Sequence, residues 1–357
     1  MRRNPGICLI VLLVVSTSSV TKTATAHEVA TGYVVKPISL TGSNAAILLD
    51  HLAYDRTNGT IWVPGSNTGN VYVIKDSGGM SVVSGFTTGE VEVEGTEAKL
   101  GPTAIALHNN IAYIGNRSDS TLSVVDARTL KRENRVDVKH HPDVPDSGPH
   151  AVAYVDATNE VWLTTGPGKS IEIFDASDPK HPKWKGRISL EAGSEGYAVD
   201  NQRGRFYTNL DGLGRTIAIE VRSHNIIADW NVESHDTQGL ALDTRRGFIF
   251  VACNDHVVSL DANHQDKILD SVGTGAGLDD IDFSLEDNIL YAAASLTATL
   301  AIVKVDDAGK FHVQDLVMTA KGSRGVIAGK KGEAYLIDPA KGQILQATRI
   351  EKPFLAR

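Results

Sequence analysis

The sequence is poor in cysteine, with only Cys8 and Cys253 among its 357 residues. Cys8 falls in an amino-terminal segment that we expect to be removed, so an intramolecular disulfide is excluded. A lone thiol in an oxidising compartment is usually buried and unreactive, and we expect this of Cys253. The sequence also has no cysteine pair and no haem-attachment motif, so the chain could not carry electrons unaided.

Long hydrophobic runs are missing as well. The amino-terminal apolar run, residues 7–15, is far shorter than the roughly 20 residues that a membrane helix needs. It follows Arg2 and Arg3 and precedes Ala24-Thr25-Ala26, a small-x-small pattern that signal peptidase accepts. The sequence therefore predicts a signal peptide over residues 1–26, cleaved near Ala26, no membrane span, and a soluble periplasmic or secreted protein.

Clusters of basic residues are absent too. Cleavage after Ala26 removes Arg2, Arg3 and Lys22 from the 35 basic residues and none of the 43 acidic ones, so the net charge falls from −8 to −11. Nucleic-acid binding depends on Lys and Arg side chains that neutralise phosphates. We therefore expect no nucleic-acid partner, and we expect the mature protein to be a monomer.

Helical periodicity is nearly absent, and a strand-rich repeat takes its place. Seven units of about 45 residues each begin with a polar residue, continue through a small residue and an alternating strand, and reach an aromatic residue. These first positions, here named the opening residues, are Asp50, Thr103, His150, Glu195, Gln238, Asp279 and Arg324. The aromatic residues that follow them by 10, 11 or 12 positions are Trp62, Tyr113, Trp162, Phe206, Phe250, Tyr291 and Tyr335. A repeat of this period is typical of a β-propeller, so we predict an all-β, seven-bladed propeller in one domain, residues 27–357.

The seventh unit is too short, since the sequence supplies only three strands for it. The segment YVVKPISL, residues 33–40, has strand composition and precedes the first unit. We predict that it adds the missing strand of blade seven and closes the ring, which would leave no long exposed sheet edge.

The motifs Tyr113-Ile114-Gly115-Asn116 and Phe206-Tyr207-Thr208-Asn209 resemble the signature of YVTN-type propeller repeats. The segments at residues 239–243, 279–283 and 334–338 resemble parts of secreted bacterial YncE-like proteins, which are described as similar to the β chain of quinoprotein amine dehydrogenases. The resemblance covers the mature chain and implies a propeller fold. It also implies one possible function, that of an accessory subunit in a redox system.

In a propeller the innermost strands all start at one face, so the seven opening residues are expected to surround one mouth of the central channel. Polar groups that converge in a concavity are the default hypothesis for a binding site. His150, Glu195 and Asp279 are the candidate ligands for a divalent metal among them.

The segment His140-His141-Pro142-Asp143-Val144-Pro145-Asp146-Ser147-Gly148-Pro149-His150 is the densest His/Asp cluster of the chain. It has two interpretations, a set of metal ligands or a solvated loop between blades. Its three prolines and its irregular spacing favour the loop.

The segment Gly277-Leu278-Asp279-Asp280-Ile281-Asp282-Phe283 places three carboxylates at the start of a strand. Strand alternation predicts that Asp280 and Asp282 share one face and that Asp279 points to the other. Asp282 takes a position that is alanine in other units, and a buried carboxylate requires a partner. Two interpretations remain, an ion pair between Asp282 and Arg324 of the next blade or a role in ligand binding, and the sequence favours the ion pair.

Two functions are compatible with this mouth. The first is a binding or scaffold protein that holds a small ligand, a metal ion or a protein segment. The second is a metal-assisted hydrolase or lactonase, in which a bound ion polarises a carbonyl group. Propeller lactonases of the gluconolactonase type are similar in architecture, and Asp50, Glu195 and Asp279 are the residues to match to their calcium ligands. Arg324 among them opposes a metal.

Overall fold

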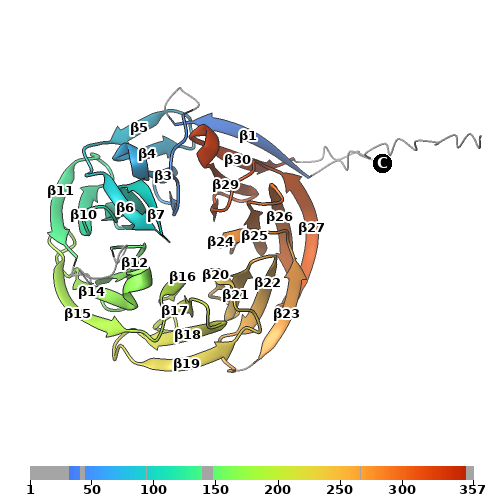
Figure 1. Cartoon of the computed structure of the whole chain (residues 1–357). Coiled ribbons are helices and arrows are strands. Elements are labelled where there is room, and N and C mark those ends of the chain that lie inside the picture. The colour runs from blue at the N-terminus through green and yellow to red at the C-terminus, as the bar shows by residue number, and fades with distance from the viewer. Residues whose placement is uncertain (1–31, 41–44, 94, 139–147, 266, 351–357) are drawn as a thin grey trace, which may run out of the picture. The chain divides into compact units, whose positions relative to one another are not determined.

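The computed structural model describes residues 32–40, 45–93, 95–138, 148–265 and 267–350. This part of the chain holds thirty β-strands and no α-helix; its only helical turns are the short 3-10 turns η1 (Ser66–Thr68), η2 (Gly166–Gly168) and η3 (Pro339–Lys341). Seven four-stranded antiparallel sheets, the blades, follow one another around a ring (Figure 1). The predicted seven-bladed all-β propeller is confirmed.

In six of the blades the strands run outward from the channel in chain order. Blade one consists of β2 (Ala53–Asp55), β3 (Thr60–Gly65), β4 (Asn70–Lys75) and β5 (Met80–Val83), and blade two of β8 (Pro102–His108), β9 (Ile111–Asn116), β10 (Thr121–Asp126) and β11 (Arg132–Asp137). Blade three consists of β12 (Ala151–Val155), β13 (Glu160–Thr164), β14 (Ser170–Asp175) and β15 (Lys183–Ser189), and blade four of β16 (Ser194–Asp200), β17 (Arg205–Leu210), β18 (Arg215–Glu220) and β19 (Ile226–Asn231). Blade five consists of β20 (Thr237–Asp243), β21 (Phe248–Cys253), β22 (His256–Asp261) and β23 (Ile268–Gly273), and blade six of β24 (Leu278–Ser284), β25 (Ile289–Ala294), β26 (Thr299–Val305) and β27 (Phe311–Met318).

Blade seven joins the two ends of the repeat. It contains β28 (Val326–Ala328), β29 (Glu333–Asp338) and β30 (Gln343–Arg349), and its outermost strand is β1 (Tyr33–Ser39). β1 pairs with β30 along its whole length, from Tyr33 opposite Arg349 to Ser39 opposite Gln343. The predicted closure of the ring by the segment that precedes the first unit is therefore confirmed.

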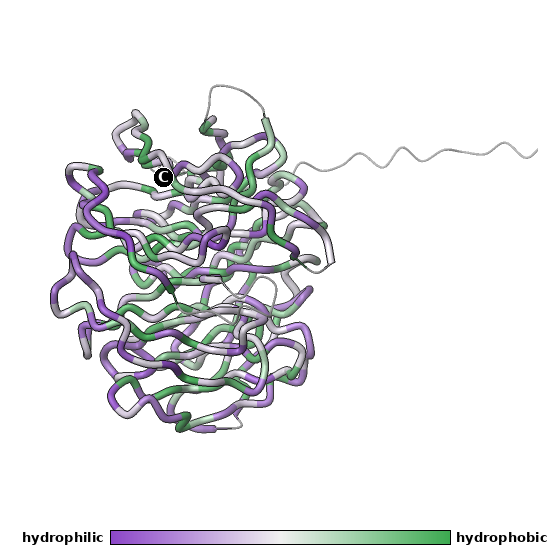
Figure 2. Tube along the Cα trace, turned by 60° about the vertical axis from the view of Figure 1, so that its left-hand side comes forward, coloured by the Kyte–Doolittle hydropathy of each residue, from purple (hydrophilic) through white to green (hydrophobic). Residues whose placement is uncertain are grey.

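The hydrophobic core lies between the blades. The buried apolar side chains form seven clusters, and each cluster joins two neighbouring blades, including blades seven and one. Figure 2 shows hydrophobic and hydrophilic residues interspersed along the trace. Because every blade shares one cluster with each neighbour, removal of any blade would expose two apolar faces.

The aromatic residue of each repeat lies on the second strand of its blade and is buried there. In six blades it pairs across the ladder with one position of the innermost strand, as Trp62 does with Ala53 and Tyr291 with Asp282. In blade four that position, Ala198, pairs with Tyr207, whereas Phe206 pairs with Val199. The aromatic position of the blade-four repeat is therefore Tyr207, and the prediction of Phe206 is one residue too early. The two aromatic residues are adjacent, so spacing alone does not separate them.

A two-stranded hairpin stands outside the repeat. Its strands, β6 (Gly89–Val93) and β7 (Thr96–Leu100), connect blade one to blade two and extend toward the centre of the ring (Figure 1). No position of the seven-unit repeat falls within this hairpin.

Candidate functional site

Six of the seven opening residues line a single cavity at one mouth of the channel. They are Asp50, His150, Glu195, Gln238, Asp279 and Arg324, and each comes from a different blade. The cavity encloses about 590 Å³. Residues separated by up to 274 positions in the chain thus converge, as in the hydrogen bond between Arg324 and Asp50.

Thr103 is the exception. Its side chain is buried, and its hydroxyl group donates a hydrogen bond to the carbonyl oxygen of Pro149 at 3.5 Å. It lines only a smaller neighbouring pocket. In blade two it is Arg117, from the loop between β9 and β10, that lines the mouth cavity.

Backbone contacts hold the starts of neighbouring innermost strands against each other. The His51 N–H group donates to the Thr103 carbonyl at 3.3 Å, and the Asp280 N–H group donates to the Arg324 carbonyl at 3.1 Å. Blades one and two, and blades six and seven, are joined in this way at the mouth itself. The opening residues therefore sit on a rigid frame of backbone.

At two other junctions the innermost strands approach each other closely because a glycine lies at the contact. A Cβ atom on Gly239 would lie 2.5 Å from the Asp279 carbonyl oxygen, and one on Gly196 would lie 2.5 Å from that of Gln238. Such distances are too short for any side chain, so glycine directly after the opening residue lets neighbouring blades approach.

Four opening residues lie at bulges, which changes where their neighbours point: Thr103, Glu195, Gln238 and Asp279. In β24, Leu278 pairs with Ala294 and Ile281 with Ala292, so the strand holds one extra residue. Asp279 and Asp280 consequently both line the mouth cavity. The alternation that predicted opposite faces for them is wrong, because a bulge resets the pleat and redirects a side chain.

Several lining residues were not predicted. His51 and Asp280 directly follow opening residues, and only a recognised bulge would have turned them inward. Glu92, Val93 and Gly95 come from the β6–β7 hairpin, and Asp211 comes from the loop after β17. The loop position of Asp211 matches that of Arg117 in blade two, so the position after the second strand was the available signal.

Asn116 and Asn209, the asparagines of the repeat signature, serve the fold. The Asn116 side chain donates to the Thr87 carbonyl oxygen at 2.9 Å, and the Asn209 side chain donates to the Gln238 carbonyl oxygen. Both residues are buried and lie outside the mouth cavity.

Ion pairs occupy the side of the cavity formed by blades six, seven, one and two. Arg324 lies 2.8 Å from Asp279 and 3.3 Å from Asp50, and Arg117 lies 3.9 Å from Asp50. A carboxylate oxygen of Asp280 lies 3.1 Å from Nδ1 of His51. On this side the carboxylates and cations neutralise one another.

The predicted ion pair between Asp282 and Arg324 is wrong. One Asp282 oxygen accepts a hydrogen bond from the Ala328 N–H group at 2.7 Å, and the other accepts one from its own neighbour Phe283 at 2.8 Å. Asp282 thus uses backbone donors, one of them from blade seven, and Arg324 pairs with Asp279. Burial raises the pKa of Asp282 to about 6, although these two hydrogen bonds oppose the rise.

The environment of the cavity shifts the pKa values of His51 and Asp50. Burial would lower the pKa of His51, but the carboxylates of Asp280 and Asp50 outweigh burial and raise it to about 10. Burial would raise the pKa of Asp50, yet His51, Arg324 and Arg117 hold it below its usual value. His51 is therefore a cation at neutral pH.

Glu195 differs from the other carboxylates. Burial, followed by the negative charges of Asp279 and Asp211, raises its pKa to about 7. Within the described ranges no cation forms an ion pair with Glu195. The adjacent Ser194, which also lines the cavity, is buried, and its hydroxyl oxygen has no hydrogen-bond partner among the described residues.

The candidate metal ligands do not assemble into a metal site. Across the described residues no group of three or more His, Cys, Asp or Glu side chains is arranged to hold a metal ion. His150, Glu195 and Asp279 share the cavity, but Arg324 lies against Asp279. Of the His140–His150 cluster, residues 140–147 lie outside the described residues.

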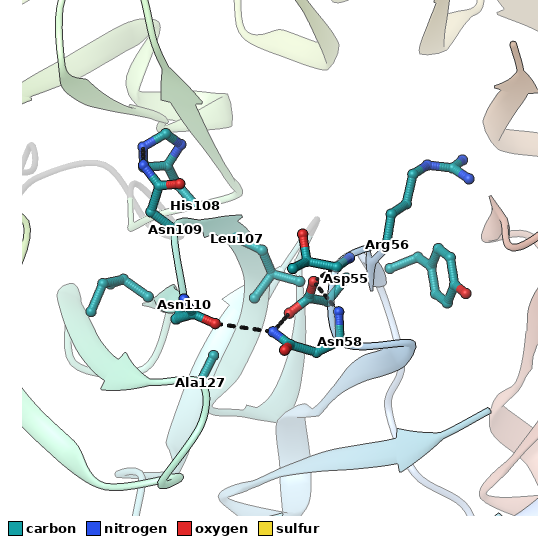
Figure 3. Close-up of a pocket in the computed structure, with 11 residues that line it drawn as sticks. Asp55, Arg56, Asn58, Leu107, His108, Asn109, Asn110 and Ala127 are labelled. Atoms are coloured by element: carbon teal, nitrogen blue, oxygen red, sulfur yellow. Dashed lines mark hydrogen bonds between the residues drawn. The ribbon is translucent and has the colours of Figure 1, made fainter. Parts of the chain in front are cut away.

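A second pocket lies at the opposite end of the innermost strands, between blades one and two (Figure 3). The Asn58 side chain donates to Asp55 at 2.7 Å and to Asn110 at 3.1 Å. Asp55 also accepts from the N–H groups of Thr57 and Asn58. The polar groups satisfy the turns that carry them, so this pocket of about 240 Å³ offers little free binding capacity.

No protein-family model and no curated protein matches the sequence. Solved propeller structures do match the fold. A chain of the mitotic checkpoint complex has a TM-score of 0.71 at 11% identity and covers 97% of this chain and 99% of its own. The β-propeller domain of Cps50 (Swd1) from Myceliophteria thermophila has a TM-score of 0.67 at 11% identity, and the match covers 89% of this chain and 100% of that domain. Virginiamycin B lyase from Staphylococcus aureus has a TM-score of 0.68 at 9% identity, and the match covers 89% of this chain and 100% of the lyase chain.

Identities this low establish the β-propeller fold and nothing finer. In the described part of the chain, no helix has the length and apolar character needed to cross a membrane.

Proposed function

We propose that this protein is a binding protein that holds a small polar ligand, or a segment of a protein partner, in the mouth cavity. The observation that carries the proposal is the convergence of six opening residues from six blades on one cavity. The volume of about 590 Å³ lies within the range of small-molecule sites, about 300–1,000 Å³. The bulges and backbone contacts at the mouth fix the lining before a ligand arrives, which lowers the entropic cost of binding.

The charges favour binding over metal-assisted hydrolysis. A guanidinium group that contacts both Asp50 and Asp279 occupies the place where a divalent ion would have to lie between them. A cation at that position repels a metal ion. The hydrolase keeps one supporting feature, since a Glu195 pKa of about 7 suits a general base near neutral pH. Hydrolysis of a lactone that is lost in Glu195→Gln would support the hydrolase.

We also propose that residues 1–26 direct export, that the mature chain of residues 27–357 is a monomer, and that it is a secreted propeller of the YncE-like kind. The basic start, the apolar run and the Ala24-Thr25-Ala26 pattern support export. The YVTN-like motifs support the relationship. Amino-terminal sequencing of the exported protein should begin at His27, and an intact Met1 on exported protein would contradict cleavage.

The binding function can be tested by thermal melting against a panel of small polar cations, anions and neutral molecules. A compound that binds the native cavity raises the melting temperature. Gln238→Trp fills the cavity wall and should abolish the shift. Gln314→Trp, the same change on the exposed face of β27, should not. Shifts that persist in Gln238→Trp, or a complete absence of shifts, would overturn the proposal.

A further inference from the structure

The mouth cavity has a paired side and an unpaired side. Six carboxylates line it, against two arginines and the protonated His51. All three cations lie beside Asp50, Asp279 or Asp280. The excess negative charge is therefore left on the remaining carboxylates, two of which, Glu195 and Asp211, belong to blade four.

Glu195 and Asp211 are neighbours across the ladder of blade four. Glu195 pairs with Asn209 and Ser194 with Leu210, so Asp211 follows the paired strand by one residue. Asp211 donates its N–H group to the Gly193 carbonyl at 2.8 Å, which continues the ladder. Glu195 and Asp211 are thus diagonal neighbours on one face, about 7–8 Å apart in such a ladder. Two like charges at this spacing repel each other unless a cation lies between them.

A third acceptor lines the cavity from the other face of β16, because Ser194 pairs with Leu210 of the core between blades three and four, whereas Glu195 pairs with Asn209. Ser194 is 3% exposed and lines the cavity, and its Oγ has no hydrogen-bond partner among the described residues. A buried hydroxyl group without a partner costs about 1–3 kcal/mol, and a ligand can recover this cost by donating to it. The blade-four side therefore offers acceptors for which the described protein supplies no donor.

We infer that the ligand carries an organic cation, a primary ammonium or a guanidinium group, which binds Glu195 and Asp211. The inference rests on the proposed binding function. A compact ammonium group has three donors and no acceptor, and this matches two carboxylates, which only accept. The rest of the ligand lies toward Val93, Pro167 and Gln238, which also line the cavity.

The inference excludes other ligand chemistries. An anion would face the excess of carboxylates, and the two arginines are already engaged. A divalent metal would require several oxygen ligands in one shell, and the described residues show no such group. An organic cation needs only the acceptors that are present.

Hexylamine, hexanol and hexanoate test the inference, because they share one carbon skeleton and differ in the charged group. Agmatine adds a guanidinium group, and calcium chloride tests a metal. Binding is measured by isothermal titration calorimetry at about pH 8, where Glu195 is ionised. We expect hexylamine and agmatine to bind at least about tenfold more tightly than hexanol, hexanoate and calcium.

Glu195→Gln should weaken the binding of hexylamine and agmatine by about tenfold or more. Glu286→Gln is the matched control, since it removes the same charge from the exposed turn between β24 and β25. It should leave the affinity unchanged. In the native protein, hexylamine affinity should also fall about tenfold per pH unit below the Glu195 pKa, a readout that needs no variant.

Tighter binding of hexanoate or calcium, an unchanged affinity in Glu195→Gln, or no binding of either cation would overturn the inference. The proposed binding function would survive those results if another compound bound native protein and failed to bind Gln238→Trp. It would fall only if nothing bound in the cavity.

Discussion

Arg324 forms an ion pair with Asp279 and, through a second contact, joins three blades. The guanidinium group lies 2.8 Å from Asp279 of blade six and also reaches Asp50 of blade one at 3.3 Å, while its own backbone belongs to blade seven. The carboxylates of Asp279 and Asp50 raise the pKa of Arg324, so the pair remains charged at any ordinary pH. These contacts link blade seven, in which the ring closes, to both of its neighbours.

The first prediction concerns the coupling of this pair. Arg324→Leu leaves Asp50 and Asp279 without their shared cation and should lower the free energy of unfolding by about 1–2 kcal/mol. This loss is smaller than that expected for a fully buried ion pair, because the arginine side chain is 47% exposed and solvent screens its charge. Asp279→Asn should relieve much of that loss in the double variant, with a coupling energy of about 1 kcal/mol. Urea denaturation of the native protein, the two single variants and the double variant measures this coupling energy.

Asp282 supplies the control for that cycle. It binds the Ala328 and Phe283 N–H groups and does not contact Arg324. Asp282→Asn combined with Arg324→Leu should therefore show additive effects. A coupling as large as that of Asp279 would contradict the assignment.

The second prediction concerns the glycine that directly follows an opening residue. A Cβ atom on Gly239 would meet the Asp279 carbonyl oxygen at 2.5 Å, so Gly239→Ala should force blades five and six apart and cost about 1–3 kcal/mol. Gly186 lies on the outer strand β15 with no atom within 4 Å of its virtual Cβ. Gly186→Ala should leave the melting temperature nearly unchanged. Equal effects of the two substitutions would show that close packing at the mouth is unimportant.

The repeat explains why so much of the fold could be predicted. Each unit buries one aromatic residue at a corresponding position, and five of the seven units place an alanine opposite it on the innermost strand, so the pattern is visible in the sequence. The closing strand at residues 33–39 was predictable because the last unit lacks a strand of its own. These features follow from local periodicity, which the sequence displays directly.

The partners at the mouth were less predictable. Asp282 and Arg324 were matched by proximity in the repeat, whereas the bulge in β24 turns Asp279 and Asp280 toward the cavity. Backbone N–H groups then satisfy Asp282, and such donors carry no residue-type signal. Val93 and the other hairpin residues were missed for a related reason, since an insertion outside a repeat has no equivalent with which to align it.

The third prediction concerns the single thiol of the described chain. Cys253 is fully buried on β21, and burial raises the pKa of its thiol to about 11. The thiolate is the reactive form, so a disulfide reagent should not label the native protein near neutral pH. Labelling should become complete in concentrated guanidinium chloride. Rapid labelling of the folded protein would contradict the burial of Cys253.

The last prediction follows from the titration of Glu195. An unfolded glutamate ionises near 4.5, whereas Glu195 in the folded protein ionises near 7. Between these values the folded state binds more protons than the unfolded state, so its stability falls as the pH rises. The protonated carboxyl group contributes its full stabilisation below 4.5, and this contribution is lost as the pH rises through about 7. Above that pH the ionised, half-buried carboxylate destabilises the fold by an amount on the order of 1–3 kcal/mol.

Glu195→Gln removes the ionisation and keeps the shape of the side chain. The variant should therefore be more stable than the native protein at about pH 8 and nearly equal to it at about pH 4. Chemical denaturation across this range, with Glu286→Gln as the exposed control, isolates the contribution of Glu195 from those of Asp279 and Asp282, which remain in all three proteins. A saturating organic cation should reduce the difference at the higher pH, because it supplies the positive charge that Glu195 lacks. A Glu195→Gln variant that loses stability at high pH would show that the carboxylate is already satisfied within the protein, and the ligand assignment would fail with it.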